Sequence, residues 1–224
     1  MTFTAIFLQI LKGLDVTATV TFLGLCFAVP FALSAGVAQQ FSTGIARASV
    51  TFIIEFWRST PLLVLMFMFY YSLPDAGINL TPTTVAAMTL GLHVGAYGSQ
   101  SVRAALQALD RGQVEAGLAL DLARPVILLK IELPQMVSAM LPTFVNQFIQ
   151  LVKGTSLVAL ITMTDMTERA KEIANQEYDP VRIYSALLLS YFIILYPATI
   201  IGRWLEETIG SRTGRRSGGR ANDV

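Results

Sequence analysis

The chain has 224 residues, of which 54% are hydrophobic and 14% are charged, and its mean hydropathy is +0.58. This composition is too apolar for an ordinary soluble domain and indicates an integral membrane protein. The net charge of +1 argues against a nucleic-acid-binding protein, and the single Cys and single His exclude a disulfide framework or a metal site of clustered ligands.

Charge-free intervals predict the spanning helices in chain order. A spanning helix needs roughly 20 mainly apolar residues, and the intervals predict an all-α protein with about five spans at 16–39, 54–74, 84–105, 135–160 and 183–205. The second span is the least regular, because Glu55 and Arg58 lie near its start and Pro61 lies inside it, so we expect a break there. Because the charge-free run of the first span is long and no basic segment precedes it, we expect this span not to be a cleaved signal peptide.

Lysine and arginine positions predict the orientation of these spans in the membrane. With the N-terminus outside, the inner segments contain Arg47, Arg58, Arg103, Arg111, Arg124, Lys130, Arg203, Arg212, Arg215, Arg216 and Arg220, and the outer segments contain Lys12, Arg169, Lys171 and Arg182. The sequence therefore predicts an outer N-terminus, a cytoplasmic 106–134 connection and a cytoplasmic C-terminus. We expect residues 1–210 to form one transmembrane domain and the basic, Gly-rich residues 211–224 to form a flexible tail weakly attracted to anionic lipid.

The 106–134 connection contains a candidate docking helix. Val114, Leu118 and Leu122 repeat at i, i+4 and i+8, which predicts a short amphipathic helix, and Pro125 suits the first turn of a second helix that ends at Pro134. Small residues, namely Ala116, Gly117 and Ala119, keep the first helix thin, so that the backbone of another protein can come close. The alternative is a surface loop that packs its own apolar stripe on the helix bundle.

An ordered series of short motifs resembles one known family. The motifs are Glu115-Ala116-Gly117, then Ile131-x-Leu133-Pro134-Gln135, together with Gly13-Leu14 and Thr17, Arg58-Ser59-Thr60-Pro61-Leu62-Leu63, Ala96-Tyr97, Gly112-Gln113, Lys153-Gly154-Thr155-Ser156-Leu157 and Tyr178-x-Pro180. They are similar, in order and spacing, to those of permease subunits of ATP-binding-cassette (ABC) importers of the polar amino-acid subfamily. The resemblance covers nearly the whole chain.

This resemblance implies a type I ABC importer permease in a bacterial inner membrane. It implies a second permease subunit, either the same chain or a paralogue, two ABC ATPase subunits that bind ATP and Mg, and a periplasmic or surface solute-binding protein. The coupling helix that docks on the ATPase is expected to comprise Val114, Glu115, Ala116, Gly117, Leu118, Asp121 and Leu122. The chain has no Gly-x-x-x-x-Gly-Lys-Ser/Thr phosphate loop, so we expect it to be non-enzymatic and to bind no cofactor or metal itself.

The fourth span carries a polar series that predicts a substrate path. With Gln100 from the third span, the predicted path comprises Asn146, Gln150, Lys153, Gly154, Thr155 and Ser156. A lone ammonium within a span costs about 2.5–3.5 kcal/mol, so we expect Lys153 to line a cavity or to pair with a polar group. Gly154 alternatively marks a close helix crossing, and the one histidine, His93, either faces the path or bonds to a neighbouring helix.

Two of these positions depart from the family pattern. Gln100 and Gly154 stand where the family has carboxylates, which indicates either a weak-binding half of a heterodimer or a substrate without strong positive charge. Asp121 stands where a Gly is usual.

A secondary transporter, the first rival function, predicts paired repeats with broken helices, and five spans do not divide into two such repeats. A non-transporting scaffold, the second rival, leaves the ordered motifs unexplained.

Overall fold

A computed structural model describes residues 1–212, and these residues are almost entirely helical. The elements in chain order are α1 (Phe3–Leu11), α2 (Leu14–Phe41), α3 (Gly44–Ser59), α4 (Leu62–Phe67), the π-helix η1 (Met68–Ser72), the 3-10 turn η2 (Pro74–Ala76), α5 (Pro82–Gln107), α6 (Arg111–Ala119), α7 (Arg124–Ile127), the π-helix η3 (Leu128–Glu132), α8 (Leu133–Gly154), the 3-10 helix η4 (Thr155–Ile161), α9 (Met166–Glu177) and α10 (Pro180–Arg212). Residues 213–224, the greater part of the predicted tail, lie outside the described residues.

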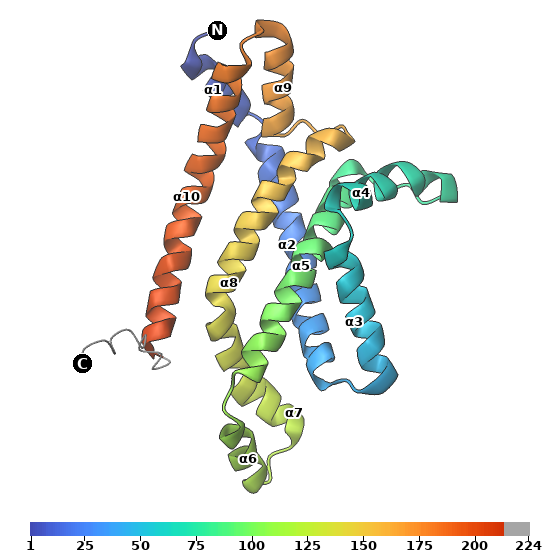
Figure 1. Ribbon diagram of the computed structural model, residues 1–224, viewed down its shortest axis with the longest axis vertical. Helices are drawn as coiled ribbons and strands as arrows, with labels where there is room; N and C mark the ends of the chain where they lie inside the picture. The colour runs from blue at the N-terminus through green and yellow to red at the C-terminus, as the bar shows by residue number, and fades with distance from the viewer. Residues whose placement is uncertain (213–224) are drawn as a thin grey trace, which may run out of the picture.

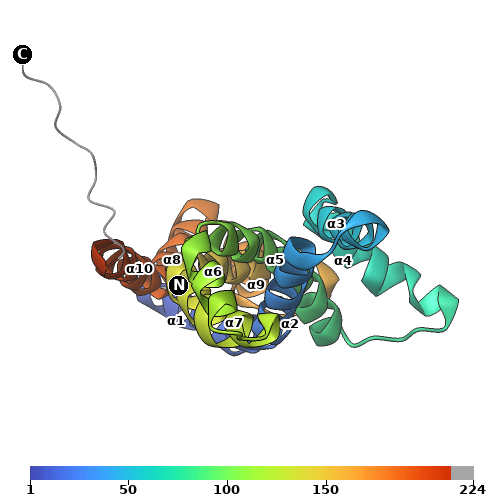
Figure 2. The ribbon, with the colours of Figure 1, turned by 90° about the horizontal axis from the view of Figure 1, so that it is seen from below.

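Long helices run side by side between two ends of the molecule (Figure 1). The N-terminus, α1, α9 and α4 lie at one end, whereas α6, α7 and the end of α10 lie at the other. Seen from below, α6 and α7 lie beneath the ends of α2, α5 and α8, and the α3–α4 segment extends to the side (Figure 2). The N-terminus and the 106–134 connection are therefore at opposite ends, with the described end of α10 on the side of the connection.

Four of the five predicted spans correspond closely to single helices or continuous helical segments. By length and hydropathy alone, three segments of the described chain qualify as membrane spans, namely Phe3–Phe41, Arg124–Ile161 and Pro180–Ile209, and the bent pair Gly44–Ser59 with Leu62–Ser72 adds a fourth. The remaining long helix is α5, which runs from end to end between α2 and α8 (Figure 1). Its Gly, Ser, Thr, His, Gln and Arg residues lower its hydropathy, and half of its residues are buried against its neighbours.

Close packing of small residues joins α2 to α5. A Cβ added to Gly91 would lie 2.4 Å from the carbonyl oxygen of Gly24, and one added to Gly36 would lie 2.6 Å from the carbonyl oxygen of Ser99. The two backbones are therefore in contact. The hydrophobic effect does not drive helices together within lipid, so spanning helices commonly associate through such close packing of small residues. Larger apolar side chains, such as Leu90 and Leu151, fill the core beside this seam.

The predicted second span at 54–74 is wrong in its boundaries. The helix that runs through the bundle is Gly44–Ser59, and the apolar Leu62–Ser72 segment turns away from it by 98°. The predicted break is confirmed, because Thr60 is extended before Pro61, as a residue preceding proline prefers. The two charges inside the predicted span form an ion pair between Arg58 Nη1 and Glu55 Oε1 at 2.7 Å, near the end of the helix Gly44–Ser59.

Two further expectations about helix ends need correction. Arg58 does not lie at the inner end of its span, because its guanidinium carbon is 5.1 Å from the ring centre of Tyr97, midway along α5. Pro134 does not end the helix that begins at Arg124, since helical structure continues through η3 into α8. The backbone widens to a π-helix over Leu128–Glu132, just before the proline, and such a turn accommodates a residue that lacks an N–H donor.

Candidate substrate pocket and coupling loop

A pocket with a volume of about 580 Å³ lies between α4, α5, α8 and η4. Its lining consists of Leu62, Leu90, His93, Val94, Tyr97, Gln147, Gln150, Lys153, Gly154, Ser156 and Leu157. The α8 residues among them occupy the last two turns of that helix, far from the loop at its other end. The pocket is large enough for a small polar solute, and its wall mixes apolar and hydrogen-bonding side chains.

The break after α3 explains how two of the lining residues are held. The end of a helix leaves backbone carbonyls without partners, and α5 supplies the donors. The Nδ1–H of His93 donates to the carbonyl of Trp57 at 2.7 Å, and the hydroxyl of Tyr97 donates to the carbonyl of Arg58 at 3.2 Å. The ring of His93 thus bonds to a neighbouring helix, which is one of the two alternatives considered for it, and the same residue lines the pocket.

The predicted path residues separate into two groups in the structure. Gln150, Lys153, Gly154 and Ser156 line the pocket, and Asn146 is exposed one turn before Gln150 on the same face of α8. The other two predicted residues lie elsewhere. Thr155 is fully buried and its hydroxyl donates to the carbonyl of Val152 at 2.7 Å.

Gln100 belongs to a polar network inside the bundle. Its Nε2 donates to Oε1 of Gln39 at 2.9 Å, and Nε2 of Gln39 donates to the hydroxyl of Thr51 at 3.0 Å. This network joins α5, α2 and α3, and it gives Gln100 partners without a ligand. The sequence contains no signal for this pairing, because it does not show which polar residues of different spans face each other.

Gly154 combines the two alternatives considered for it. A Cβ at this position would lie 2.5 Å from Cδ2 of Leu90, so α8 and α5 cross closely here. The same residue lines the pocket beside Lys153. A side chain at this position would have to displace the tip of Leu90, which is itself part of the pocket wall.

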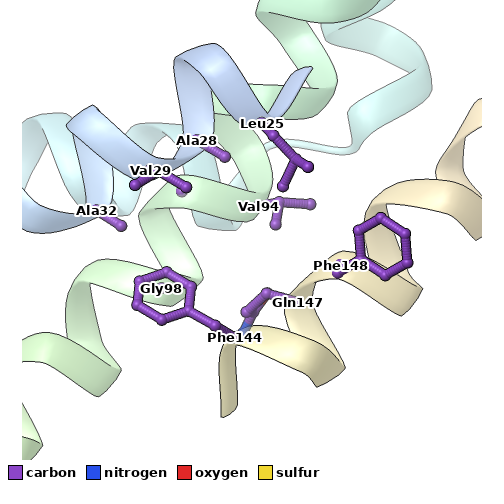
Figure 3. Close-up of a pocket in the computed structure, with 10 residues that line it drawn as sticks. Leu25, Ala28, Val29, Ala32, Val94, Gly98, Phe144, Gln147 and Phe148 are labelled. Carbon is purple, nitrogen blue, oxygen red and sulfur yellow. The ribbon is translucent and has the colours of Figure 1, made fainter. Parts of the chain in front are cut away.

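A second, much smaller crevice lies between α2, α5 and α8 (Figure 3). Figure 3 shows Phe144, Gln147 and Phe148 on the α8 side of it and Leu25 and Val94 on the opposite side, with the ring of Phe144 beside Gly98. The crevice has a volume of about 10 Å³ and an almost entirely apolar lining. That volume suits about one water molecule at most, so it is a packing gap and not a solute site.

The predicted amphipathic helix exists as α6, and its start and end follow standard capping. The carboxylate of Asp110 accepts a hydrogen bond from the N–H of Gly112 at 2.9 Å. At the other end, the N–H groups of Asp121 and Leu122 bond to the carbonyls of Leu118 and Gly117, both at 3.0 Å. This is a Schellman motif, which requires a left-handed residue after the helix. Asp121 is this left-handed residue, with a φ of 57°. Glycine adopts this conformation most easily and is usual here in the family, whereas this chain has an aspartate.

The exposed face of α6 differs in part from the predicted stripe. Leu118 and Leu120 are 54% and 75% exposed, whereas Leu122 lies beyond the helix end at Ala119. Gly117 points inward, because a Cβ there would lie 2.8 Å from Cδ1 of Ile127 on α7. Its small size therefore serves contact between α6 and α7, and not the predicted approach of a partner's backbone.

Two side-chain contacts that the sequence did not predict attach this loop to the long helices, and a third, between Arg124 and Glu132, lies within the loop. The amides of Gln113 and Gln135 bond reciprocally, at 3.2 and 2.6 Å. The guanidinium of Arg124 pairs with the carboxylate of Glu132, which is 6% exposed. The same guanidinium lies over the ring of Phe41 at the end of α2. The loop is thus connected to α2 and α8 by side chains as well as by the backbone.

The fold and these two sites define a multispan helical membrane protein with a pocket between its helices and a protruding helical loop. Residues 28–214 match the family described as binding-protein-dependent transport system inner membrane component. The chain belongs to this family, which confirms the resemblance to ABC importer permeases. Within the described residues, no group of three His, Cys, Asp or Glu side chains is placed to hold a metal ion.

Named relatives and a solved structure agree with this assignment. A protein of Sinorhizobium fredii named as a probable amino-acid ABC transporter permease is 32% identical, over 92% of this chain and 89% of its own length. The glutamine transport system permease protein of Escherichia coli is 33% identical, over 88% of this chain and 91% of its own length. A crystal structure titled as an amino acid ABC transporter with histidines is 27% identical, with a TM-score of 0.80 over 89% of this chain and 94% of that one.

Proposed function

We propose that this chain is one of two permease subunits of an importer that moves a polar amino acid across the inner membrane. The names of the similar proteins support an amino-acid substrate, since they specify glutamine in one case and amino acids in others. The observation that carries the proposal is the continuous helical segment Arg124–Ile161, which has the loop at one end and the pocket at the other. A movement of the loop is therefore delivered directly to the pocket wall.

In this proposal, α6 and α7 dock on an ABC ATPase subunit that binds ATP and Mg. Leu118 and Leu120 provide apolar contact area, and Glu115 and Arg111 are exposed beside them at the rim. Closure of two ATPase subunits around ATP would move the docked loops as rigid bodies. A solute-binding protein would deliver the substrate at the opposite end of the bundle.

The second permease subunit, a copy or a paralogue, would cover the polar face of α8. Asn146, Gln150 and Lys153 follow i, i+4 and i+7 spacing, and all three are exposed on the single chain. Polar side chains at membrane depth do not face lipid, because lipid offers them no hydrogen bonds. A path between two permease subunits gives this face water, substrate or partner side chains to contact.

The proposed orientation places α6 in the cytoplasm, on the basis of the excess of Arg at that end. Single cysteines in a Cys26→Ser background would test it. Thr2→Cys and Asn175→Cys should react with membrane-impermeant thiol reagents applied to intact cells, and Ala119→Cys should react only after the membrane is opened. The reverse labelling would overturn the proposal, because the loop must face the ATPase.

The docking proposal is tested by Leu118→Asp in the complete importer. Leu118 is 54% exposed in the free chain, so the substitution leaves the fold intact, but it places an uncompensated carboxylate in an apolar interface. Substrate uptake and co-purification of the ATPase should both be lost. Val181→Asp, at an exposed position at the opposite end, is the matched control and should retain both. Normal uptake by Leu118→Asp would show that the loop is only a surface connection.

A further inference from the structure

The charges around the pocket suggest which substrates it accepts. Lys153 is the one cationic residue in the lining, and no Asp or Glu contributes to that lining among the described residues. Lys153 is exposed, and within residues 1–209 its ammonium takes part in no hydrogen bond or ion pair. Within this chain, the pocket therefore presents a positive charge that no acidic side chain compensates.

The ion pair between Arg58 and Glu55, which contacts the pocket lining through Tyr97, does not cancel the charge of Lys153. Arg58 stacks on the ring of Tyr97, a lining residue, with 5.1 Å between the guanidinium carbon and the ring centre. Its partner Glu55 is already engaged with Arg58 Nη1 at 2.7 Å. The pair is neutral as a whole, and its cationic member is the one that touches the pocket wall.

Neutral acceptors beside Lys153 complete a site for an amino-acid backbone. Gln147 and Gln150 each present an amide oxygen, and Ser156 a hydroxyl whose proton is given to the carbonyl of Lys153 at 2.8 Å, which leaves its lone pairs free. Such groups can accept hydrogen bonds from the α-ammonium of a zwitterionic amino acid. They do not compensate a second, fixed cation on the side chain of a substrate.

We propose that this pocket selects substrates by charge: Lys153 pairs with a substrate carboxylate, and the site accepts neutral or acidic amino acids and rejects those with a cationic side chain. This inference rests on the proposed function and specifies the substrate class of the same pocket. A lysine or arginine substrate would bring a second positive charge within a few ångströms of Lys153. The repulsion between these two like charges opposes binding of such a substrate.

The test uses the complete importer with its ATPase and partner permease in lipid nanodiscs, without the solute-binding protein, so that only the membrane site binds ligand. The affinities for L-glutamate, L-glutamine and L-lysine are measured by isothermal titration calorimetry. Wild type should bind glutamate and glutamine at least about tenfold more tightly than lysine. Lys153→Gln should remove this difference, and Lys153→Arg should retain it. Lys12→Gln changes the net charge equally outside the pocket lining and should behave as wild type.

A gain-of-function variant protects the test against simple loss of folding. Gln150→Glu is nearly isosteric and adds a carboxylate near Lys153, so it should raise the affinity for lysine and lower that for glutamate. Equal binding of lysine and glutamine by wild type would overturn the inference. So would the absence of binding of all three ligands, or unchanged selectivity in both Lys153→Gln and Gln150→Glu.

Uptake measurements on the same variants separate this inference from the proposed function. ATP-driven uptake that depends on the solute-binding protein, combined with indifference to substrate charge at the membrane site, would leave the permease assignment intact and overturn the charge selection. Absence of such uptake in wild type would instead overturn the proposed function, and the charge selection with it.

Discussion

The guanidinium carbon of Arg124 lies 5.0 Å from the ring centre of Phe41, so the first turn of α7 is held against the last turn of α2. The same guanidinium pairs with Glu132, whose carboxylate is nearly inaccessible to solvent. Arg124 thus links the loop to a helix far away in the sequence. Under the proposed function, this residue transmits movement of the docked loop to α2 as well as to α8.

Arg124→Gln should therefore destabilise the protein and weaken coupling. Removing the cation leaves the carboxylate of Glu132 buried without its partner, at a cost of about 1–3 kcal/mol. The apparent melting temperature should fall, and substrate-stimulated ATPase activity should fall with it. Arg124→Lys keeps the charge but not the planar fork, and should be intermediate. A variant Arg124→Gln with the stability and coupling of wild type would show that the contact has no mechanical role.

Gly117 and Ile127 form a complementary pair that mutagenesis can test. A Cβ at Gly117 would meet Cδ1 and Cγ1 of Ile127 at 2.8 and 2.9 Å, so Gly117→Ala overpacks the contact between α6 and α7. We expect a loss of about 1–3 kcal/mol in stability, measured as a lower melting temperature of the purified complex. Ile127→Val removes the nearer of these two carbons, Cδ1, and should restore part of the stability in the double variant. Ala119→Ser, at an exposed position, is the control; a Gly117→Ala protein as stable as this control would contradict the proposed packing.

The elements that the sequence predicted well are those in which a single physical signal dominates. The span 16–39 is free of charges and the span 183–205 has none before Arg203, and the structure has helices there. The prediction for the second span failed because the charge-free run that defined it follows Arg58, and the structure turns by 98° at that point. Glu55 and Arg58 neutralise each other near the end of the helix Gly44–Ser59, which forms the span. A charge-free run does not show where the chain bends.

The candidate site was predictable only in part, for a related reason. Helical spacing identified the α8 face that carries Gln150 and Lys153, because that depends on one helix alone. It did not identify Tyr97, or the pairing of Gln100 with Gln39, since these depend on which helices meet and at what height. The contacts of a helix bundle are set by shape at interfaces, which a single sequence does not display.

Asp165 predicts a pH dependence of stability. The side chain is fully buried at the start of α9, outside the spanning helices, where it accepts hydrogen bonds from the N–H of Glu168 and the hydroxyl of Tyr191. Burial raises its pKa above the ordinary value of 3.8, although these hydrogen bonds act in the opposite direction. The folded state therefore binds this proton more tightly than the unfolded state does.

The stabilising contribution of Asp165 should consequently be full below the unfolded pKa of 3.8 and be lost as pH rises through the raised folded pKa. Asp165→Asn imitates the neutral form and keeps a good N-cap residue. In that variant, the rise in melting temperature on acidification across this window should be smaller than in wild type. An identical pH profile for the two proteins would show that the carboxyl group is not the titrating group responsible.

The seam between α2 and α5 gives the sharpest prediction about stability, because two glycines in it face different kinds of atom. A Cβ at Gly91 would lie 2.4 Å from a backbone oxygen of α2, which cannot move without shifting the whole helix. A Cβ at Gly24 would lie 3.1 Å from Cδ1 of Leu151, the tip of a side chain that can rotate. Gly91→Ala should therefore prevent assembly of the complex or lower its melting temperature strongly, whereas Gly24→Ala should lower it only slightly. Both substitutions add the same methyl group and the same helix propensity, so the difference between them isolates the backbone contact. Equal melting temperatures for the two variants would mean that α2 and α5 are not packed backbone to backbone.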